Sequence, residues 1–293
     1  MATEVSSSDR LVIELQDTIR QDVKIALAED IGGGDLTAAL IDADAVVGAK
    51  IVARQSLVLA GHPWASEVFR QLDESIQADW YVEDGQSAAE DDVICKLVGP
   101  ARPILSGERT ALNFLQTLSA TATTTAAYVA AIDGTRTKLL DTRKTLPGLR
   151  HAQKYAVRCG GGLNHRVGLF DAILIKENHI RSAGGIAAAL QRARAYGDDV
   201  LVEIEVESLQ ELRQALDGGA VRVLLDNFSL DDLRAAVALN ADYGYAAAEL
   251  EASGNVTLET IRSIAETGVD YISTGAITKN ISAVDLSMLF SID

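Results

Sequence analysis

The amino-acid sequence predicts an α/β protein in which an N-terminal α+β domain precedes an incomplete, TIM-like (β/α) barrel. Three observations lead to this fold class. After residue 133, short apolar runs typical of strands alternate with helical segments. Each run ends in a polar or glycine-bearing turn, and successive turns are 21 to 35 residues apart, the length of a strand plus a helix. The first part of the sequence has no such regular alternation.

The N-terminal part is expected to form a domain over residues 1–112. Its apolar spacing predicts an amphipathic helix over 10–29, followed by a glycine-rich turn at 31–35. Strand-like runs follow at 49–53, 57–60, 76–82 and 93–98, with one helix at 63–72. A helical pattern then extends over 107–118 and resumes near 126–132.

The strands of the barrel are expected within residues 113–277. Six apolar runs qualify, at 137–140, 172–175, 200–204, 221–225, 247–252 and 271–273. A complete barrel has eight strands, and its active site lies at their C-terminal ends, where all six turns would meet. A doubly wound open sheet is the alternative. It would need a glycine-rich phosphate loop after its first strand, where the sequence has Asp-Thr-Arg-Lys at 141–144.

Charge is distributed unevenly along the sequence. The net charge of −16 argues against nucleic acid or an anionic membrane as partners, and no apolar run is long enough to span a membrane. Residues 136–176, however, contain nine basic and only two acidic side chains, a local charge of +7. A basic segment in an acidic protein favours a pocket for a small, highly anionic ligand. The two cysteines lack the spacing of a metal site, and we expect a cytoplasmic protein.

Most candidate ligand-binding residues lie in this basic segment. Arg143 and Lys144 follow the first barrel strand, and arginine suits a planar carboxylate whereas lysine suits a phosphate. His165 and Arg166 precede the second strand, which ends at Lys176. Any one of these side chains alone would more commonly be a solvated surface charge. Because the set converges on one face of the barrel, we expect it to bind a ligand, with His165 hydrogen-bonded to the substrate.

Acidic residues mark the ends of the next two strands. Glu203 and Glu205 are two residues apart in one strand and share a face, so at least one should point into the barrel mouth. An inward carboxylate needs a cation or hydrogen-bond donors. One interpretation is a structural ion pair. The other is that Glu205 and Asp226 meet the hydroxyl groups of a bound sugar, or a metal ion.

Two glycine turns follow the last two strands, where barrels often bind phosphate through main-chain N–H groups. Either turn alone is weak evidence, because any tight strand-to-helix turn can contain glycine. Together, opposite the basic segment, they favour a phosphate site. Its residues would be Ser253, Gly254, Asn255, Thr274, Gly275 and Ala276.

Four segments resemble the quinolinate phosphoribosyltransferase family, at 107–115, 140–150, 159–166 and 174–180. The resemblance extends over nearly the whole sequence. It implies an incomplete barrel over 113–277 and an N-terminal sandwich domain that the C-terminal tail, 278–293, rejoins. It also implies a homodimer or a higher homo-oligomer in which Arg109 reaches the neighbouring active site.

The resemblance further implies a reaction, the transfer of phosphoribose from phosphoribosyl pyrophosphate (PRPP) to quinolinate with loss of CO₂, a step of NAD biosynthesis. Mg²⁺ would bind the pyrophosphate. The catalytic residues would be Lys144, Lys176, Glu205 and Asp226, of which the last two would also face the ribose and the metal. The substrate-binding residues would be Arg109, Thr142, Arg143, Lys144, His165, Arg166 and Lys176, together with the two glycine turns.

Two alternatives stay open at this point. A related phosphoribosyltransferase would act on another pyridine carboxylate such as nicotinate. Nicotinate has only one carboxylate, whereas the crowding of Arg143, Arg166 and the partner's Arg109 favours two. A non-catalytic protein that binds an anionic metabolite would have no use for Glu205 and Asp226 beside its ligand.

Overall fold

The computed structural model describes residues 7–197 and 200–291, which form two compact units. Unit 1 comprises residues up to 126, 146–161 and from 281 on, and unit 2 comprises residues 127–145 and 162–280. The first unit therefore extends beyond the expected boundary at residue 112, and it includes 146–161, which we expected in the barrel. None of the described helices is long and apolar enough to cross a membrane.

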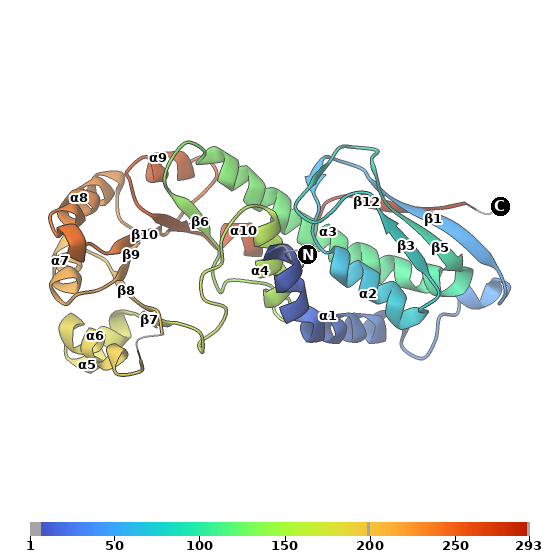
Figure 1. Cartoon of the computed structure of the whole chain (residues 1–293), viewed down its shortest axis with the longest axis horizontal. Helices are drawn as coiled ribbons and strands as arrows, with labels where there is room; N and C mark the ends of the chain where they lie inside the picture. Colours follow the sequence, from blue (N-terminus) through green and yellow to red (C-terminus); the bar gives the residue numbers. More distant parts are fainter. Residues whose placement is uncertain (1–6, 198–199, 292–293) are drawn as a thin grey trace, which may run out of the picture. The chain divides into compact units, whose positions relative to one another are not determined.

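Unit 1 is built on a four-stranded antiparallel sheet (Figure 1). Its strands, in spatial order, are β12 (Leu286–Ser291), β1 (Val46–Ala53), β5 (Val93–Pro100) and β3 (Gln77–Trp80). A separate ladder joins β2 (Leu57–Val58) to β4 (Ser87–Ala88). The helices are α1 (Ser7–Ile31), α2 (His62–Leu72), α4 (Arg150–Cys159), most of α3 (Ala101–Ala131) and the short η1 (Ala38–Leu40). The four predicted runs all contain strands, whereas β4 and β12 are not among the predicted elements.

The core of unit 1 explains why residues 146–161 belong to it. The α1 helix buries positions four apart along one face, Leu15, Ile19, Val23 and Leu27. The α4 helix contributes Ala152, Tyr155 and Ala156 to the same core. At the end of α4, Gly160 approaches α3 so closely that a Cβ atom there would lie 2.4 Å from the carbonyl oxygen of Ala122. The α4 helix is thus fitted against α3 within the first unit.

The α3 helix is continuous over 31 residues, whereas the sequence predicts two helices with an interruption near 119–125. Several threonines in that stretch are compatible with a helix because their hydroxyls donate to carbonyls one turn earlier. Thr125 Oγ1 donates to the carbonyl of Thr121 at 2.7 Å, and Thr121 Oγ1 donates to that of Thr117 at 3.3 Å. The prediction of two helices was wrong, because the polar residues between 119 and 125 continue the helix.

Unit 2 contains a six-stranded, all-parallel sheet in the order β6-β11-β10-β9-β8-β7. Its strands are β6 (Lys138–Leu140), β7 (Ile173–Ile175), β8 (Val202–Val206), β9 (Arg222–Asp226), β10 (Glu249–Ser253) and β11 (Tyr271–Ser273). From β7 to β11 each strand pairs with its successor in the chain, and β11 pairs with β6. This is the order of a barrel interrupted between β6 and β7. The predicted incomplete barrel is confirmed, and the doubly wound alternative is excluded because its strand order would reverse.

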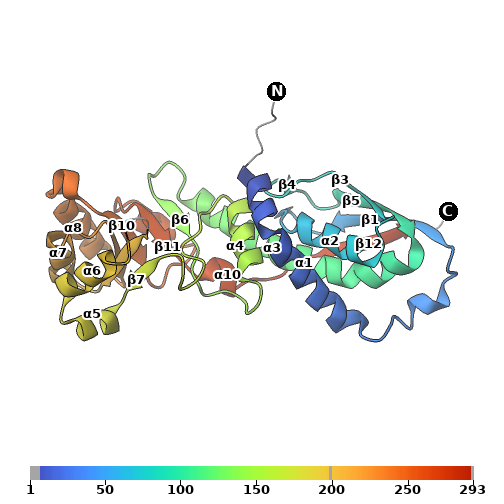
Figure 2. The same ribbon diagram turned by 60° about the horizontal axis from the view of Figure 1, so that its bottom comes forward.

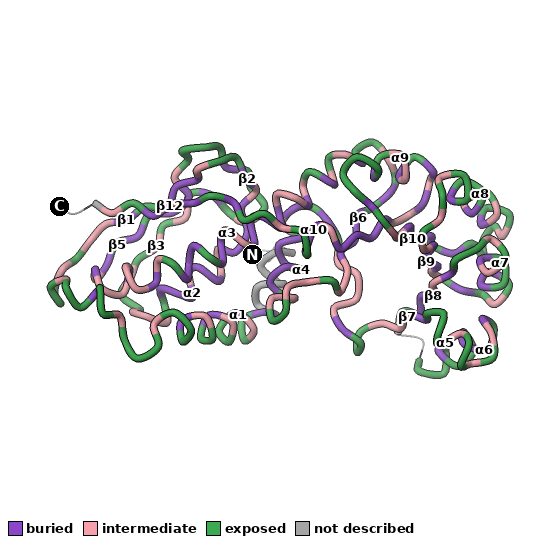
Figure 3. The backbone as a smooth tube through the Cα atoms, turned by 180° about the vertical axis from the view of Figure 1, so that it is seen from behind, coloured by how far each residue is buried: buried purple, intermediate pink, exposed green. Residues whose placement is uncertain are grey.

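Helices lie outside the curved sheet of unit 2 (Figures 1 and 2). They are α5 (Glu177–Ala183), α6 (Ile186–Arg194), α7 (Leu209–Asp217), α8 (Leu230–Ala241), α9 (Ile261–Ala265), α10 (Ala276–Lys279) and the short η2 (Gly244–Ala246). Figure 3 shows mostly buried strands, and helices that alternate between buried and exposed residues along their length. The α6, α7, α8 and α9 helices each bury an apolar face, as expected for strand-plus-helix units, whereas α5 and η2 bury no residue.

The segment between α4 and β7 runs beside the open edge of β6. Leu163 forms a parallel bridge with Leu140. Its N–H donates to the carbonyl of Leu139 at 2.8 Å, and its own carbonyl accepts from the N–H of Asp141 at 3.1 Å. This pairing brings the residues that follow Leu163 to the C-terminal end of the sheet.

Candidate active site

A cavity of about 300 Å³, called the arginine cavity below, lies at the C-terminal ends of the strands of unit 2. All six strands line it, either directly or through the turn that follows them. Its polar lining consists of Thr142, Arg143, Lys144, His165, Arg166, Lys176, Glu205, Asp226, Glu251, Ser253 and Ser273. The structure thus brings together every predicted site residue from Thr142 to Asp226.

A second cavity of about 360 Å³, the glycine-loop cavity, is lined by both predicted glycine turns. The two cavities share the lining residues Thr142, Lys144, Ser253 and Ser273. The turn at Gly254 requires glycine, because its φ is 105° and a Cβ atom there would lie 2.2 Å from Asn227 Oδ1. The remaining lining residues from the two turns are Asn255, Thr274, Gly275 and Ala276. Lys144 is therefore placed to contact ligands in either cavity.

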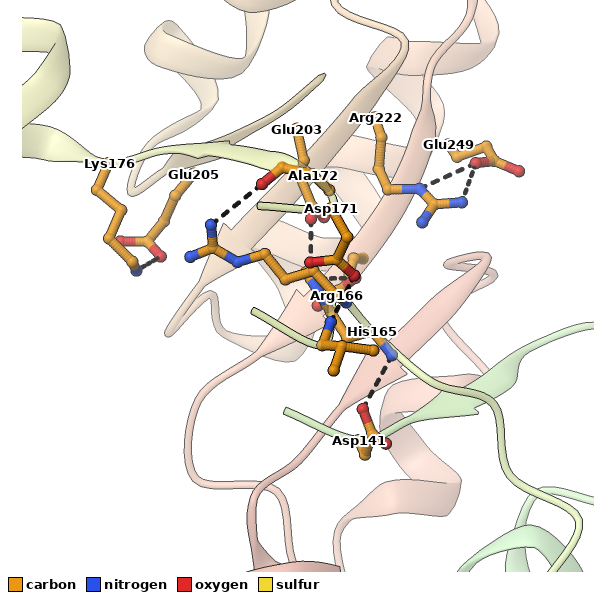
Figure 4. Close-up of polar contacts among 12 residues, drawn as sticks. Asp141, His165, Arg166, Asp171, Ala172, Lys176, Glu203, Glu205, Arg222 and Glu249 are labelled. Carbon is orange, nitrogen blue, oxygen red and sulfur yellow. Dashed lines mark hydrogen bonds and ion pairs between the residues drawn. The ribbon is translucent and has the colours of Figure 1, made fainter. Parts of the chain in front are cut away.

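The positively charged guanidinium groups of Arg143 and Arg166 repel one another in the arginine cavity. Arg166 Nη1 donates to the carbonyl of Ala172 at 3.3 Å (Figure 4). Burial lowers the pKa of Arg166, and the positive charge of Arg143 lowers it further, against the opposing carboxylates of Asp171, Glu203 and Glu205. The site therefore holds two like charges together in a partly desolvated place. An anion with two carboxylates would relieve this repulsion and accept several charge-assisted hydrogen bonds.

The segment that carries Arg166 is fixed by a buried acid. Asp141, which is fully buried at the end of β6, accepts from the N–H of His165 at 2.9 Å and from Asn164 Nδ2 at 2.6 Å. The N–H of Arg166 donates to His165 Nδ1 at 2.7 Å, and His165 Nε2 contacts Glu203. Both ring nitrogens of His165 thus have protein partners. His165 also lines the cavity, and its hydrogen bond to a substrate stays a prediction.

Two buried carboxyl groups lie next to the His165 ring. Glu203 of β8 is 1% exposed and Glu251 of β10 is 0% exposed. His165 Nε2 lies 2.9 Å from Glu203 Oε2 and 3.6 Å from Glu251 Oε2. Burial and the charge of Glu203 raise the pKa of Glu251 to about 8, against the opposing effects of His165 and Ser273. Glu251 is therefore mainly protonated at neutral pH.

Glu251 is not among the predicted site residues. The signal was present, since Glu251 stands in an apolar run two residues before Ser253 and shares its face of the strand. The same alternation marks Glu203 and Glu205.

An ion pair joins the ends of β7 and β8. Lys176 Nζ donates to Glu205 Oε2 (Figure 4), so the structural interpretation of Glu205 holds, while both residues also line the arginine cavity. Asp226, the last residue of β9, accepts from Asn227 Nδ2 at 2.8 Å. Two carboxylates from neighbouring strands thus face the same cavity.

Glu205 and Asp226 fit the preferences of Mg²⁺. This ion takes oxygen ligands and is typically held by one or two carboxylates together with substrate phosphates and water. Among the described residues, a different group of three converges within 4.8 Å: His165, Glu203 and Glu251. In this group, His165 Nε2 lies 2.9 Å from Glu203 Oε2, which matches a hydrogen-bond distance. This is shorter than the distance of about 3.0–3.4 Å expected between two ligands that each lie about 2.1 Å from one metal ion.

Arg109 belongs to unit 1, where it is exposed on α3. All other predicted site residues belong to unit 2.

Family models and known relatives match this chain over most of its length. The family model described as quinolinate phosphoribosyl transferase, C-terminal domain, matches residues 121–289, and the model of the N-terminal domain matches residues 35–119. The chain is 44% identical over 261 residues to the probable nicotinate-nucleotide pyrophosphorylase (carboxylating) of Bacillus subtilis, covering 89% of each chain. It is 40% identical to the corresponding enzyme of Mycobacterium leprae, covering 93% of this chain and 97% of the relative.

A solved structure of an enzyme with the same name is also similar to this chain. The nicotinate-nucleotide pyrophosphorylase of Francisella tularensis is 50% identical and superimposes with a TM-score of 0.90, covering 94% of this chain and 96% of that one. Since two family models together span residues 35–289 and close relatives match over almost their full length, the chain belongs to the quinolinate phosphoribosyltransferase family.

Proposed function

We propose that this enzyme transfers the phosphoribosyl group of PRPP to the ring nitrogen of quinolinate and forms nicotinate mononucleotide, pyrophosphate and CO₂. The observation that carries the proposal is the pair of guanidinium groups, Arg143 and Arg166, in one cavity with Lys144 and Lys176. Four cationic side chains around about 300 Å³ match a ligand of multiple negative charge.

The arginine pair also favours quinolinate over nicotinate. Each carboxylate can accept a pair of hydrogen bonds from one guanidinium group. A ligand with one carboxylate would offer only one such acceptor group to the two guanidinium groups, Arg143 and Arg166, and would offset less of their combined positive charge.

The transfer step requires negative charge on the enzyme. As the ring nitrogen forms its bond to the anomeric carbon and pyrophosphate departs, positive charge develops on the ribose. Glu205 and Asp226 would face that charge and stabilise it, because they line the cavity from neighbouring strands. The ion pair with Lys176 holds the Glu205 side chain in place.

Decarboxylation follows from the transfer. Once alkylated, the ring nitrogen is cationic. The bond from the adjacent carbon to its carboxylate can then break, with the electron pair left on that carbon beside the positive nitrogen. CO₂ departs, and a proton takes its place.

The phosphate groups would lie in the glycine-loop cavity, whose turns offer main-chain N–H groups and whose wall includes Lys144. Glu205 and Asp226 are the residues that would hold Mg²⁺, together with water and the pyrophosphate. When bound, the ion disperses the negative charge of the departing pyrophosphate.

We further propose a homodimer, or a higher homo-oligomer built on it, in which Arg109 completes the neighbouring site. The exposure of Arg109 on α3 leaves it available for such a contact. The free cysteines Cys95 and Cys159 suit a cytoplasmic protein.

The direct test is an assay of the purified protein with quinolinate, PRPP and Mg²⁺. Pyrophosphate and CO₂ should appear in equal amounts and only when all three are present. EDTA should abolish turnover, and nicotinate should be a poor substrate. Equal turnover of nicotinate, or turnover undiminished by EDTA, would contradict the proposal.

A binding experiment tests the observation on which the proposal rests. Arg166→Ala should weaken quinolinate binding by about 2–5 kcal/mol and change PRPP binding much less. Arg262→Ala is the matched control, because Arg262 forms a solvent-exposed ion pair with Glu266, donates to a main-chain carbonyl group and does not line the arginine cavity. Unchanged quinolinate affinity of the Arg166 variant would refute the assignment.

A further inference from the structure

A buried chain of polar groups lies behind the substrate-binding residues of the arginine cavity. We infer that Glu203 and Glu251 are positioning residues, which hold the His165 ring and, through it, the main chain of Arg166 in the orientation that binds a substrate carboxylate. This inference rests on the proposed function, because it concerns the residues that would hold quinolinate.

The hydrogen bond from the N–H of Arg166 indicates which ring nitrogen of His165 carries the proton. The N–H of Arg166 donates to His165 Nδ1 at 2.7 Å, so Nδ1 acts as an acceptor and the ring proton belongs on Nε2. That nitrogen lies 2.9 Å from Glu203 Oε2. The imidazole therefore connects a backbone amide at the cavity to a carboxylate in the core. A rotation of the ring would break both contacts together.

The charge of Glu203 has few other partners nearby. Arg222 lies close enough to act on Glu203 electrostatically, but its guanidinium is turned toward Glu249, with which it forms an ion pair (Figure 4), and it stacks over the ring of Tyr271 at 4.5 Å. Within the described part of the chain, the buried oxygens of Glu203 and Glu251 have no aligned hydrogen-bond donor, so the 2.9 Å contact of His165 Nε2 with Glu203 Oε2 is an electrostatic one. Buried carboxyl oxygens of this kind are costly unless a nearby positive charge or a proton offsets them.

Glu251 supplies that proton. Two adjacent buried carboxyl groups cannot both be ionised at low cost. Burial and the charge of Glu203 raise the pKa of Glu251, so Glu251 is the carboxyl group that retains a proton.

The position of Glu203 argues for an indirect role. Glu203 is buried and does not line the arginine cavity, whereas His165 and Arg166 do. Its effect on a ligand must therefore pass through those two residues. Residues that orient ligand-binding groups in this way typically change affinity about 10–100-fold when they are replaced.

Calorimetric titration with quinolinate tests the inference. Glu203→Gln should raise the dissociation constant about tenfold and leave that of PRPP within about twofold. Glu251→Gln retains a neutral donor and should stay within about twofold, whereas Glu251→Ala should resemble the Glu203 variant. Glu249→Gln, two residues earlier on the same strand, is the matched control and should change neither affinity.

A double-mutant cycle shows whether Glu203 acts through Arg166. If it does, the tenfold loss caused by Glu203→Gln should shrink to about twofold in an Arg166→Lys background, since contacting residues are non-additive. Full additivity of the two substitutions would overturn the inference.

A readout that needs no substrate separates this inference from the proposed function. The chain has only four histidines, so long-range ¹H–¹⁵N spectra of their rings are simple, and a His165→Asn variant assigns the signal. The wild-type ring should show a protonated Nε2 and an unprotonated Nδ1, and Glu203→Gln should shift that signal whereas Glu249→Gln should not. A signal unmoved by Glu203→Gln, or a bound metal found by elemental analysis of the protein, would overturn the positioning role. Failure of the wild type to bind quinolinate would refute the proposed function instead.

Discussion

The protonation of Glu251 should give the protein a distinctive dependence of stability on pH. Glu251 has an ordinary pKa of 4.5 in the unfolded chain and a pKa raised to about 8 in the folded protein, through burial and the charge of Glu203. Below pH 4.5 the carboxyl is protonated in both states, so it causes no difference. Between these values the unfolded chain loses the proton and the folded protein keeps it, so this group lowers the free energy of unfolding as pH rises.

The size of the effect follows from the two pKa values. Each pKa unit corresponds to about 1.4 kcal/mol, so the loss attributable to Glu251 between pH 4.5 and pH 8 is about 3–5 kcal/mol. The side chain is fully buried, so solvent screening does not reduce this figure much. In Glu251→Gln the amide has no proton to lose, and this contribution disappears. The other groups that face Glu251, Glu203 and His165, are present in both proteins.

Urea denaturation at pH 5, 6, 7 and 8 measures the difference directly. The free energy of unfolding of the wild type should fall relative to that of Glu251→Gln by about 1 kcal/mol for each pH unit. Parallel pH profiles of the two proteins would show that Glu251 is ionised in the folded state, and would refute this account of the buried pair.

Three further predictions concern packing, assembly and catalysis. Gly160→Ala should lower the free energy of unfolding by about 2–3 kcal/mol in urea melts, because its Cβ would meet α3, whereas Gly33→Ala, with no atom within 4 Å of the added Cβ, should change it by less than about 0.5 kcal/mol. Mixing inactive Arg109→Ala and Lys144→Ala chains should restore roughly a quarter of wild-type activity if each site is shared in a dimer that exchanges subunits at random, and demonstrated exchange without recovery would rule out sharing. Asp226→Asn should lower kcat while calorimetry finds quinolinate affinity nearly unchanged, and full turnover at saturating PRPP and Mg²⁺ would make Asp226 structural.

The sequence predicted the barrel unit well because its signals are local. A buried parallel strand is a short apolar run, and the polar residue that ends it is visible in the sequence. The run at 271–273 coincides with β11, and Asp226 does end β9. The same regularity predicted that the cavity residues from Thr142 to Asp226 lie together, as they do in the arginine cavity.

Other features depend on contacts that the sequence does not display. The assignment of α4 to unit 1 results from its packing against α3, and the continuity of α3 results from threonine hydroxyls that satisfy its own carbonyls. The two ring-nitrogen contacts of His165 depend on the pairing of Leu163 with β6, which no local pattern announces. Glu251 could have been found from strand alternation, but its partnership with Glu203 required the register of β8, β9 and β10.

The pairing of β1 with β12 has a consequence for how the protein is made. Each residue of β1 in this ladder meets a partner more than 230 positions later in the chain. While the ribosome is still translating the barrel, β1 therefore has one unpaired edge, and an exposed edge is a template for association with other nascent chains. All the strands of unit 2 leave the ribosome before β12 does. Most of the barrel unit can thus begin to fold before β12 is available, whereas the sheet of unit 1 is completed only when β12 pairs with β1, and chaperones that shield strand edges would act in that interval.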